Sequence, residues 1–379
     1  MRSIGIYVHV PFCQSKCPYC DFVSYTGKSQ VEKDAYLAAL LKEGASYQSL
    51  LAGVTGKSLY IGGGTPTCLT GGQLIMLFTA LHKLFKLPQN IEITIETNPG
   101  TINEEKLLAL SKIGCNRLSL GVQSFNPREL QALGRIHSPE DVYNTYELAR
   151  CTGFKNINLD LMYGLPGQQV QDWRDNLKKV VTLRPEHISL YQLNIEKNTP
   201  FAFLLQKGLL ENFDQDEAFI MYSEAISYLE AKGYHHYEIS NFALPGKKAV
   251  HNSLYWLNEE YLGLGAGASG YLQGVRYTNE SNLEDYQRAL LTQNRLPVAE
   301  KELIDEELAM GESMFLGLRL LQGVNKSEFL KRHGISIENR YEHVLKGLKK
   351  QGLLQETLTH VALTKKGVFV ANNVFQEFL

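Results

Sequence analysis

The sequence predicts an α/β protein built around a parallel sheet. From the start of the chain to about residue 195, short runs rich in β-branched residues alternate with helix-like segments, as in successive βα units. Polar residues follow these runs, and three cysteines follow the first run in one short loop. Parallel α/β folds place their functional sites at the carboxyl ends of the strands. The predicted sheet therefore has a candidate site along that edge.

Six strands are predicted, with helices between them. The helix signals are clear in "SPEDVYNTYELARCTG", where Ser138 is the N-cap, Pro139 takes the first helical position and Gly153 follows the end. The predicted strands are Ile4–Val10, Ser58–Ile61, Ile91–Thr97, Arg117–Gly121, Asn156–Met162 and His187–Leu193.

The third strand indicates which side chains face inward. In "IEITIET" the isoleucines alternate with Glu92, Thr94 and Glu96, so these polar side chains point toward the inside of a curved sheet or barrel. The strand ends carry, in chain order, Tyr7, Gly62–Pro66, Glu96, Gln123, Asp160 and Asn194. A single one of these strand-end groups could simply cap a helix or fix the conformation of a loop. Six in succession predict one shared cavity.

The loop "PFCQSKCPYCDF" carries Cys13, Cys17 and Cys20 in the spacing C-x3-C-x2-C. Three thiolates suit a metal centre, but a structural zinc or a fully ligated iron–sulfur cluster uses four protein ligands. The trio therefore predicts an iron left open for a small molecule. His9 could complete a zinc site, but it lies within the strand, and the second half of a zinc ribbon or finger is missing.

The composition of the 379 residues is that of an ordinary soluble protein, with a formal net charge of −2 and no apolar run long enough to span a membrane. The chain shows no signal peptide, and its other cysteines, Cys68, Cys115 and Cys151, are scattered. These features disfavour a disulfide framework and predict a cytoplasmic protein. Strong nucleic-acid binding is not expected.

A glycine-rich loop, "IGGGTPT", follows the second strand. Gly62, Gly63 and Gly64 let the main chain approach a ligand closely and present amides to a carboxylate or phosphate, and Thr65 adds a hydroxyl. Such turns are common and carry little weight alone. Beside an open iron, the loop indicates a ligand that both chelates iron and has polar groups, such as an amino acid derivative.

The motifs "YVHVPFC", "YIGGGTPT", "IETNPG", "LSLGVQSF", "LGRIHS" and "INLDLMYGLPGQ" resemble the radical S-adenosylmethionine (SAM) superfamily. They are most similar to the branch that contains oxygen-independent coproporphyrinogen III oxidase and the HemW heme chaperones. The resemblance runs through most of the chain. It implies a partial (β/α)6 TIM-like barrel with a four-iron four-sulfur (4Fe-4S) cluster on Cys13, Cys17 and Cys20.

The same resemblance implies a SAM site beside the cluster. The implied SAM contacts are Tyr7, Gly63, Gly64, Thr65, Glu96, Gln123, Arg135 and Asp160. The amino and carboxylate groups of SAM would chelate the open iron, and Glu96 and Asp160 can accept hydrogen bonds from its amine or ribose hydroxyls. One electron from the cluster would cleave SAM to methionine and a deoxyadenosyl radical. Whether the chain cleaves SAM as an enzyme stays open.

Phe22 separates the two branches. The decarboxylating oxidase has a further cysteine where this chain has Phe22, and a longer segment before the motif, whereas twelve residues precede Cys13 here. Both departures favour the heme chaperones. The alternatives are an oxygen-independent coproporphyrinogen III dehydrogenase, which forms protoporphyrinogen IX, and a radical SAM enzyme with another substrate.

A second motif supports the chaperone branch. The segment "VHNSLYW" matches the H-N-x-x-Y-W pattern of those chaperones with His251, Asn252, Tyr255 and Trp256. Imidazole is a common axial ligand of heme iron, and aromatic rings can pack on a porphyrin. The alternative is a core histidine among structural aromatics. His235 and His236 are reserve heme ligands.

The glycines of "GAGASG" satisfy G-x-G-x-x-G, but "YLQGVRYTN" after them reads as a strand, which disfavours a dinucleotide-binding fold.

The predicted domains are the barrel over residues 1–200, an extension with the heme motif over 201–300, and a C-terminal mixed α+β, winged-helix-like domain over 301–379. That last domain is predicted to end in a hairpin at "HVALTKKGVFV". From residue 324 on, nine Lys/Arg face five Asp/Glu, an excess too diffuse to predict DNA binding.

The function that the resemblance implies is transfer of heme to apo-hemoproteins, which we expect to belong to the respiratory chain. The expected cofactors are the 4Fe-4S cluster, SAM and heme. A homodimer, and peripheral contact with a membrane through partner proteins, stay open.

Overall fold

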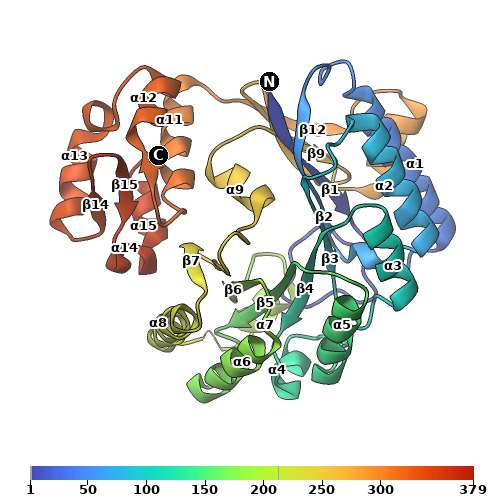
Figure 1. Cartoon of the computed structure of the whole chain (residues 1–379), viewed down its shortest axis with the longest axis horizontal. Helices are drawn as coiled ribbons and strands as arrows, with labels where there is room; N and C mark the ends of the chain where they lie inside the picture. The colour runs from blue at the N-terminus through green and yellow to red at the C-terminus, as the bar shows by residue number, and fades with distance from the viewer. Residues whose placement is uncertain (1, 212) are drawn as a thin grey trace.

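The computed structural model describes residues 2–211 and 213–379. Its described part is organised around one curved sheet of twelve strands in the order β12-β11-β10-β9-β1-β2-β3-β4-β5-β6-β8-β7 (Figure 1). The strands of this sheet are β1 (Ser3–Val10), β2 (Thr55–Gly63), β3 (Glu92–Thr97), β4 (Arg117–Gln123), β5 (Ile157–Tyr163), β6 (His187–Gln192), β7 (His235–Glu238), β8 (Asn241–Ala243), β9 (Tyr261–Leu264), β10 (Ser269–Leu272), β11 (Val275–Asn279) and β12 (Val298–Leu303).

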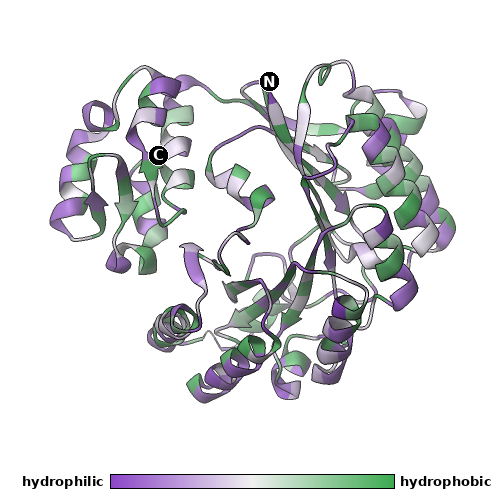
Figure 2. Cartoon of the chain, in the orientation of Figure 1, coloured by the Kyte–Doolittle hydropathy of each residue, from purple (hydrophilic) through white to green (hydrophobic). Residues whose placement is uncertain are grey.

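Helices connect the strands, and α1 to α6 cover the convex side of the sheet, whereas α9 lies on its concave side (Figure 1). The helices up to residue 292 are α1 (Gln30–Ser46), η1 (Pro66–Cys68), α2 (Gly71–Phe85), α3 (Glu104–Lys112), α4 (Pro127–Ala132), α5 (Pro139–Cys151), α6 (Val170–Leu183), α7 (Pro200–Gln206), α8 (Gln215–Ala231), α9 (Val250–Trp256), α10 (Leu283–Gln287) and η2 (Arg288–Thr292). Along α6, hydrophobic and hydrophilic residues alternate around the axis, as expected of a helix with one buried face (Figure 2).

The six predicted strands are confirmed as β1 to β6, which pair in parallel in chain order. Their bounds shift by a few residues, so that β2 begins at Thr55 rather than Ser58. The predicted helix is α5. Ser138 forms a capping box with Asp141, and Gly153 beyond the end has a φ of 95°. The partial barrel is therefore the fold of this chain.

The extension after residue 200 is continuous with the barrel. At one edge β9 pairs in parallel with β1, and at the other edge β8 pairs antiparallel with β6. One hydrophobic core runs from Ile4 to Leu290. The segment after "GAGASG" forms β10 and β11, which confirms the predicted strand. The hydrophobic core therefore continues across the predicted boundary at residue 200.

The C-terminal part has a core of its own, which includes Met314 and Phe378. It contains α11 (Glu306–Gly317), β13 (Val324–Asn325), α12 (Lys326–His333), α13 (Ile337–Lys350), β14 (Leu354–Glu356), β15 (His360–Leu363), α14 (Lys365–Phe369) and α15 (Ala371–Gln376). The prediction of a hairpin in "HVALTKKGVFV" is wrong, because β15 pairs with the earlier strand β14. Thr364 then caps a helix by accepting a hydrogen bond from the Gly367 amide at 3.0 Å.

The described helices include none that is long and apolar enough to cross a membrane.

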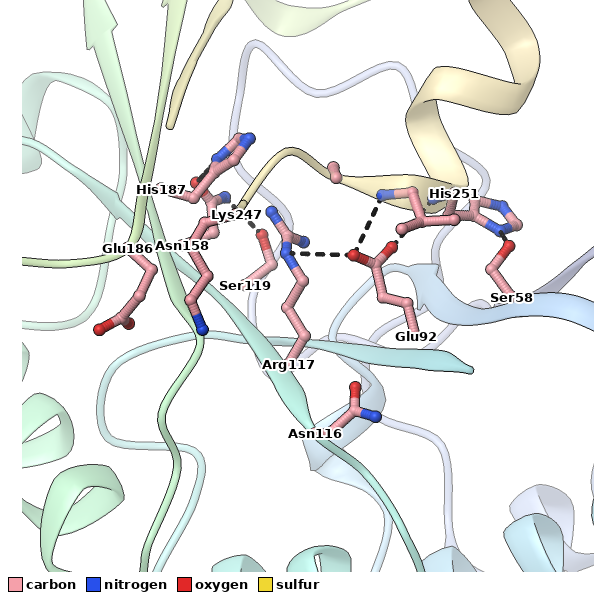
Figure 3. A network of polar contacts seen from close by, with 12 residues as sticks. Ser58, Glu92, Asn116, Arg117, Ser119, Asn158, Glu186, His187, Lys247 and His251 are labelled. Carbon is pink, nitrogen blue, oxygen red and sulfur yellow. Dashed lines mark hydrogen bonds and ion pairs between the residues drawn. The ribbon is translucent and has the colours of Figure 1, made fainter. Parts of the chain in front are cut away.

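A buried polar network on the concave side of the sheet holds α9 in place (Figure 3). The Glu92 carboxylate on β3 accepts hydrogen bonds from the backbone amides of Val250 at 3.0 Å and His251 at 2.9 Å, at the start of α9. It also lies 3.9 Å from Arg117 Nε, and these two side chains are 8% and 2% exposed. The predicted inward direction of Glu92 is therefore confirmed, and its role is to fix a helix against the sheet.

We expect Glu92→Ala to lower the free energy of unfolding by about 3 kcal/mol, because it leaves the buried Arg117 guanidinium without its counter-charge and two helix amides without their acceptor. Urea unfolding measures this loss. Glu300→Ala is the control, since Glu300 is an exposed strand glutamate, and we expect a change within about 0.5 kcal/mol. Equal stability of the two variants would contradict the account.

Candidate functional site

The cysteine loop lies between β1 and α1. Its backbone is held by hydrogen bonds from the Cys13 amide to the Tyr25 carbonyl at 3.0 Å and from the Cys20 amide to the Cys17 carbonyl at 3.1 Å. All three cysteines are half-buried. Burial raises the pKa of the Cys13 and Cys20 thiols. A bound metal would offset this effect, because it stabilises the thiolate.

Two hydrogen-bond donors from other elements point at the thiols. The Thr65 hydroxyl lies 3.7 Å from Cys13 Sγ, and Arg135 Nη1 lies 3.6 Å from Cys17 Sγ. Donors of this kind stabilise thiolates and tune the potential of a cluster that they ligate. The loop is therefore supported by a second layer of polar groups, as metal centres are.

Gly64 is required by the close approach of the glycine-rich loop to the cysteine loop. A Cβ atom at this position would lie 2.7 Å from the Phe12 carbonyl oxygen and 2.9 Å from Cys13 Sγ. Gly63 has a φ of 114°, and a Cβ atom there would lie 2.7 Å from the His9 ring. Both predicted glycines thus serve the packing of the cluster loop.

The donor set fits a 4Fe-4S cluster better than a zinc ion. Among the described residues, no three His, Cys, Asp or Glu side chains converge on a single point suited to one metal ion. In a four-iron cluster each cysteine binds a different iron, so the thiolates stay apart. His9 uses both ring nitrogens elsewhere, with Tyr7 Oη at 2.9 Å and the Val23 carbonyl at 2.8 Å. It ties the strand to the loop.

Glu96 lies beside the glycine-rich loop inside the barrel. Its carboxylate accepts hydrogen bonds from Tyr60 Oη at 2.7 Å and from the Gly63 amide at 3.1 Å. Burial raises the pKa of Glu96 to about 7, and the charge of Asp160 adds to this rise. The Asp160 carboxylate accepts a hydrogen bond from the side-chain Nδ2 of Asn158 at 2.8 Å. Burial also raises the pKa of Asp160. Two half-buried acids with raised pKa values are typical of a ligand site.

Arg135 connects the cluster loop to the end of β4. Its Nη2 donates to Asn98 Oδ1 at 2.6 Å and to the Gly121 carbonyl at 2.8 Å. A Cβ atom at Gly121 would lie 2.7 Å from Asn98 Oδ1 and 3.0 Å from Gln123 Nε2. Asn98 also donates to Thr65 Oγ1 at 2.8 Å. The structure thus brings together Arg135, Gln123 and Thr65, which the sequence had assigned to one site.

Asn98 is a site residue that the sequence analysis missed. It follows Glu96 by two positions in "IETNPG", directly after the carboxyl end of β3. That position was a usable signal. Asn194, by contrast, does not join the cluster side of the rim: it is exposed and lines a different cavity.

His251 is buried, with 1% of its surface exposed. Its Nδ1 lies 2.8 Å from Ser58 Oγ (Figure 3), and its Nε2 lies 2.8 Å from Tyr255 Oη. The ring also stacks on Tyr60 with centroids 5.1 Å apart. Burial lowers the pKa of His251 to about 3. In this conformation neither ring nitrogen is free to bind iron, so coordination would require Tyr255 to release Nε2.

The H-N-x-x-Y-W motif is divided between two faces of α9. His251 hydrogen-bonds to Tyr255 and to Ser58 of β2, whereas Asn252 and Trp256 line a cavity of about 950 Å³. Of the reserve heme ligands, His235 is exposed. His236 stacks on Phe242 with centroids 4.3 Å apart.

Comparison with known proteins fits this arrangement. The family model of the radical SAM superfamily matches residues 7–180, and that of the HemN C-terminal domain matches residues 304–370. Proteins named heme chaperone HemW match along nearly their whole length. The one from Bacillus subtilis is 40% identical, with 98% of each chain covered, and the one from Escherichia coli is 33% identical, with 100% of this chain and 99% of the relative covered. The chain belongs to the HemW family. Lactococcus lactis has another such relative, 39% identical over 98% of this chain and 96% of its own.

The HemW family shares its architecture with a solved enzyme. The structure of coproporphyrinogen III oxidase from E. coli, described as a radical SAM enzyme, superposes with a TM-score of 0.87 at 26% identity, covering 100% of this chain and 90% of that one. Fold alone therefore does not separate a chaperone from a porphyrinogen enzyme. The site residues must do so, and Phe22 is one of them, with its side chain 63% exposed in the cysteine loop.

We expect Gly64→Ala to reduce the iron and sulfide that the protein retains after anaerobic reconstitution. The added methyl group would displace Cys13 or cost about 1–3 kcal/mol of overpacking. Gly72→Ala is the matched control, because a Cβ atom there meets nothing within 4 Å. Equal iron content in the two variants would show that the contact between the two loops does not matter for the cluster.

Proposed function

We propose that this chain is a heme chaperone of the radical SAM superfamily, which binds a 4Fe-4S cluster, SAM and heme and passes heme to apo-hemoproteins. The observation that carries this proposal is the similarity to HemW proteins over nearly the whole chain, 40% identity in the relative from Bacillus subtilis. In addition, two residues of the H-N-x-x-Y-W motif, Asn252 and Trp256, line a large cavity. A cavity of about 950 Å³ is within the range of sites that enclose a molecule of porphyrin size.

The cluster would be held by Cys13, Cys17 and Cys20. It supplies one-electron chemistry and an open iron when it is bound. Arg135 and Thr65 donate to the thiolates, and they lie at 3.6 Å and 3.7 Å from them. The three cysteines would hold the cluster, and the Arg135 guanidinium would neutralise part of its charge.

SAM would lie between the cluster loop and the inner face of the barrel. Glu96 and Asp160 supply acceptors for its amine and ribose hydroxyls, while Arg135 and Gln123 supply donors for its carboxylate or sugar. Tyr7, whose ring lies 6.2 Å from that of Tyr60, would border the ligand. The remaining contacts in this proposal are the backbone of Gly63 and Gly64 and the hydroxyl of Thr65.

Heme would be recognised through the motif on α9, with His251 as the axial ligand once its ring has left Tyr255 and Ser58 and turned toward the cavity, which it does not line in this conformation. Trp256 and Asn252 already face the cavity. In the absence of heme, the Tyr255 hydroxyl, 2.8 Å from Nε2, would keep this nitrogen hydrogen-bonded and unavailable to iron.

The alternative function is coproporphyrinogen III oxidation, and the observation in its favour is the superposition with the E. coli oxidase. Phe22 argues against it, because it stands where the resemblance places a further cysteine in that enzyme. We further propose that the recipients are respiratory hemoproteins and that the protein is cytoplasmic. The association of two copies and contact with membranes through partners are parts of the same proposal.

The test is a heme titration of anaerobically purified, cluster-loaded protein, followed by absorption in the Soret region. We expect His251→Ala to shift the spectrum and to weaken heme binding by about tenfold or more, the loss of one strong ligand. His235→Ala is the matched control, since His235 is exposed. Thermal unfolding of both variants shows whether the fold is kept. An unchanged spectrum and affinity in His251→Ala would remove His251 as the ligand.

A further inference from the structure

The 950 Å³ cavity lies between the barrel and the C-terminal part of the chain. Its walls come from the ends of β5 and β6, from α8 and α9, and from the segment around α14 and α15 (Figure 1). Many of the lining side chains are aromatic: Tyr163, Tyr191, Phe213, Phe219, Tyr222, Trp256 and Phe369. These rings lie among many polar side chains of the same wall, a combination that suits a flat ligand with polar groups at its edge.

Four buried polar atoms in this cavity have no hydrogen-bond partner among the described residues. They are Oε2 of Glu238, Oδ1 of Asn241, Nε1 of Trp256 and Nε of Arg319. Glu238 and Asn241 are 0% and 3% exposed. An unpaired buried polar group costs about 1–3 kcal/mol, so the wall of this cavity holds four unsatisfied donors and acceptors just beneath its surface.

Arg319 brings a positive charge to this wall from the C-terminal part of the chain. Its guanidinium lies 4.3 Å from the ring centre of Trp256 and 6.0 Å from that of Phe375. Two aromatic rings hold the group in place, its Nε has no hydrogen-bond partner among the described residues, and its charge interacts with the Glu238 carboxyl. A guanidinium fixed in this way can bind a carboxylate through two parallel hydrogen bonds.

Glu238 is compatible with an anionic ligand nearby. Burial raises the pKa of this carboxyl. The group therefore keeps its proton to a higher pH than usual, and in that form it donates a hydrogen bond instead of repelling a carboxylate.

We propose that Arg319 is the anchor for a propionate carboxylate of heme in this cavity, with Trp256 beside it on the same wall. This inference rests on the proposed heme chaperone function and extends it by assigning a residue outside the H-N-x-x-Y-W motif. It concerns the carboxylate end of the ligand and leaves the iron ligand as described above. The C-terminal part of the chain is thereby a functional wall of the heme site.

The test compares heme with heme dimethyl ester, in which both propionates are esterified, on the full-length, cluster-loaded protein. We expect the wild type to bind heme roughly 10- to 100-fold more tightly than the ester, and Arg319→Gln to lose most of this preference, because a charge-assisted hydrogen bond to the carboxylate is removed. Arg340→Gln is the matched control, another arginine of the C-terminal part that stacks on an aromatic ring, at 5.1 Å from Tyr341. It should keep the wild-type preference.

Arg319→Lys guards against a variant that fails to fold, because it keeps the charge and should lie between wild type and Arg319→Gln. Equal binding of heme and ester by the wild type would overturn the assignment, as would an unchanged preference in folded Arg319→Gln. A wild type that binds neither porphyrin would instead overturn the proposed chaperone function, and this inference with it. These results are distinguishable from one another.

Discussion

The contact between Glu92 and the start of α9 is the constraint on which the rest of this structure depends. A seven-residue helix has few hydrogen bonds of its own, and it owes its position to the carboxylate that accepts from its first amides. Because that carboxylate is on β3 beside the buried Arg117, the helix is fixed on the concave side of the sheet. Together with the bond between Ser58 and His251, this acid fixes which residues of the motif face inward and which face the cavity.

This placement separates two sites that the chain could otherwise have merged. On the cluster side, Arg135, Asn98 and Thr65 link the cysteine loop to the ends of β2, β3 and β4. On the other side, Trp256 and Arg319 close a cavity shared with the C-terminal part. The barrel interior between them is occupied by hydrogen-bonded side chains.

The sequence was sufficient to predict what local patterns control. Alternation along "IEITIET" predicted the inward acids, and cap residues predicted α5, because both depend on neighbours in the chain. The site was harder. The segment "VHNSLYW" is too short to show which helix face is buried, so the two hydrogen-bonded nitrogens of His251 could not be foreseen. The cavity wall combines residues that are far apart in the chain, Asn241, Trp256 and Arg319. The predicted hairpin was wrong because β15 pairs with β14, and no local sequence pattern shows that contact.

The central proposal is that this chain carries heme rather than making its precursor. The most direct measurement gives cluster-loaded protein, under anaerobic conditions, both heme with an apo-hemoprotein and, separately, coproporphyrinogen III with SAM and a reductant. The account predicts that heme appears in the recipient and that no protoporphyrinogen forms. Formation of protoporphyrinogen without heme transfer would contradict it.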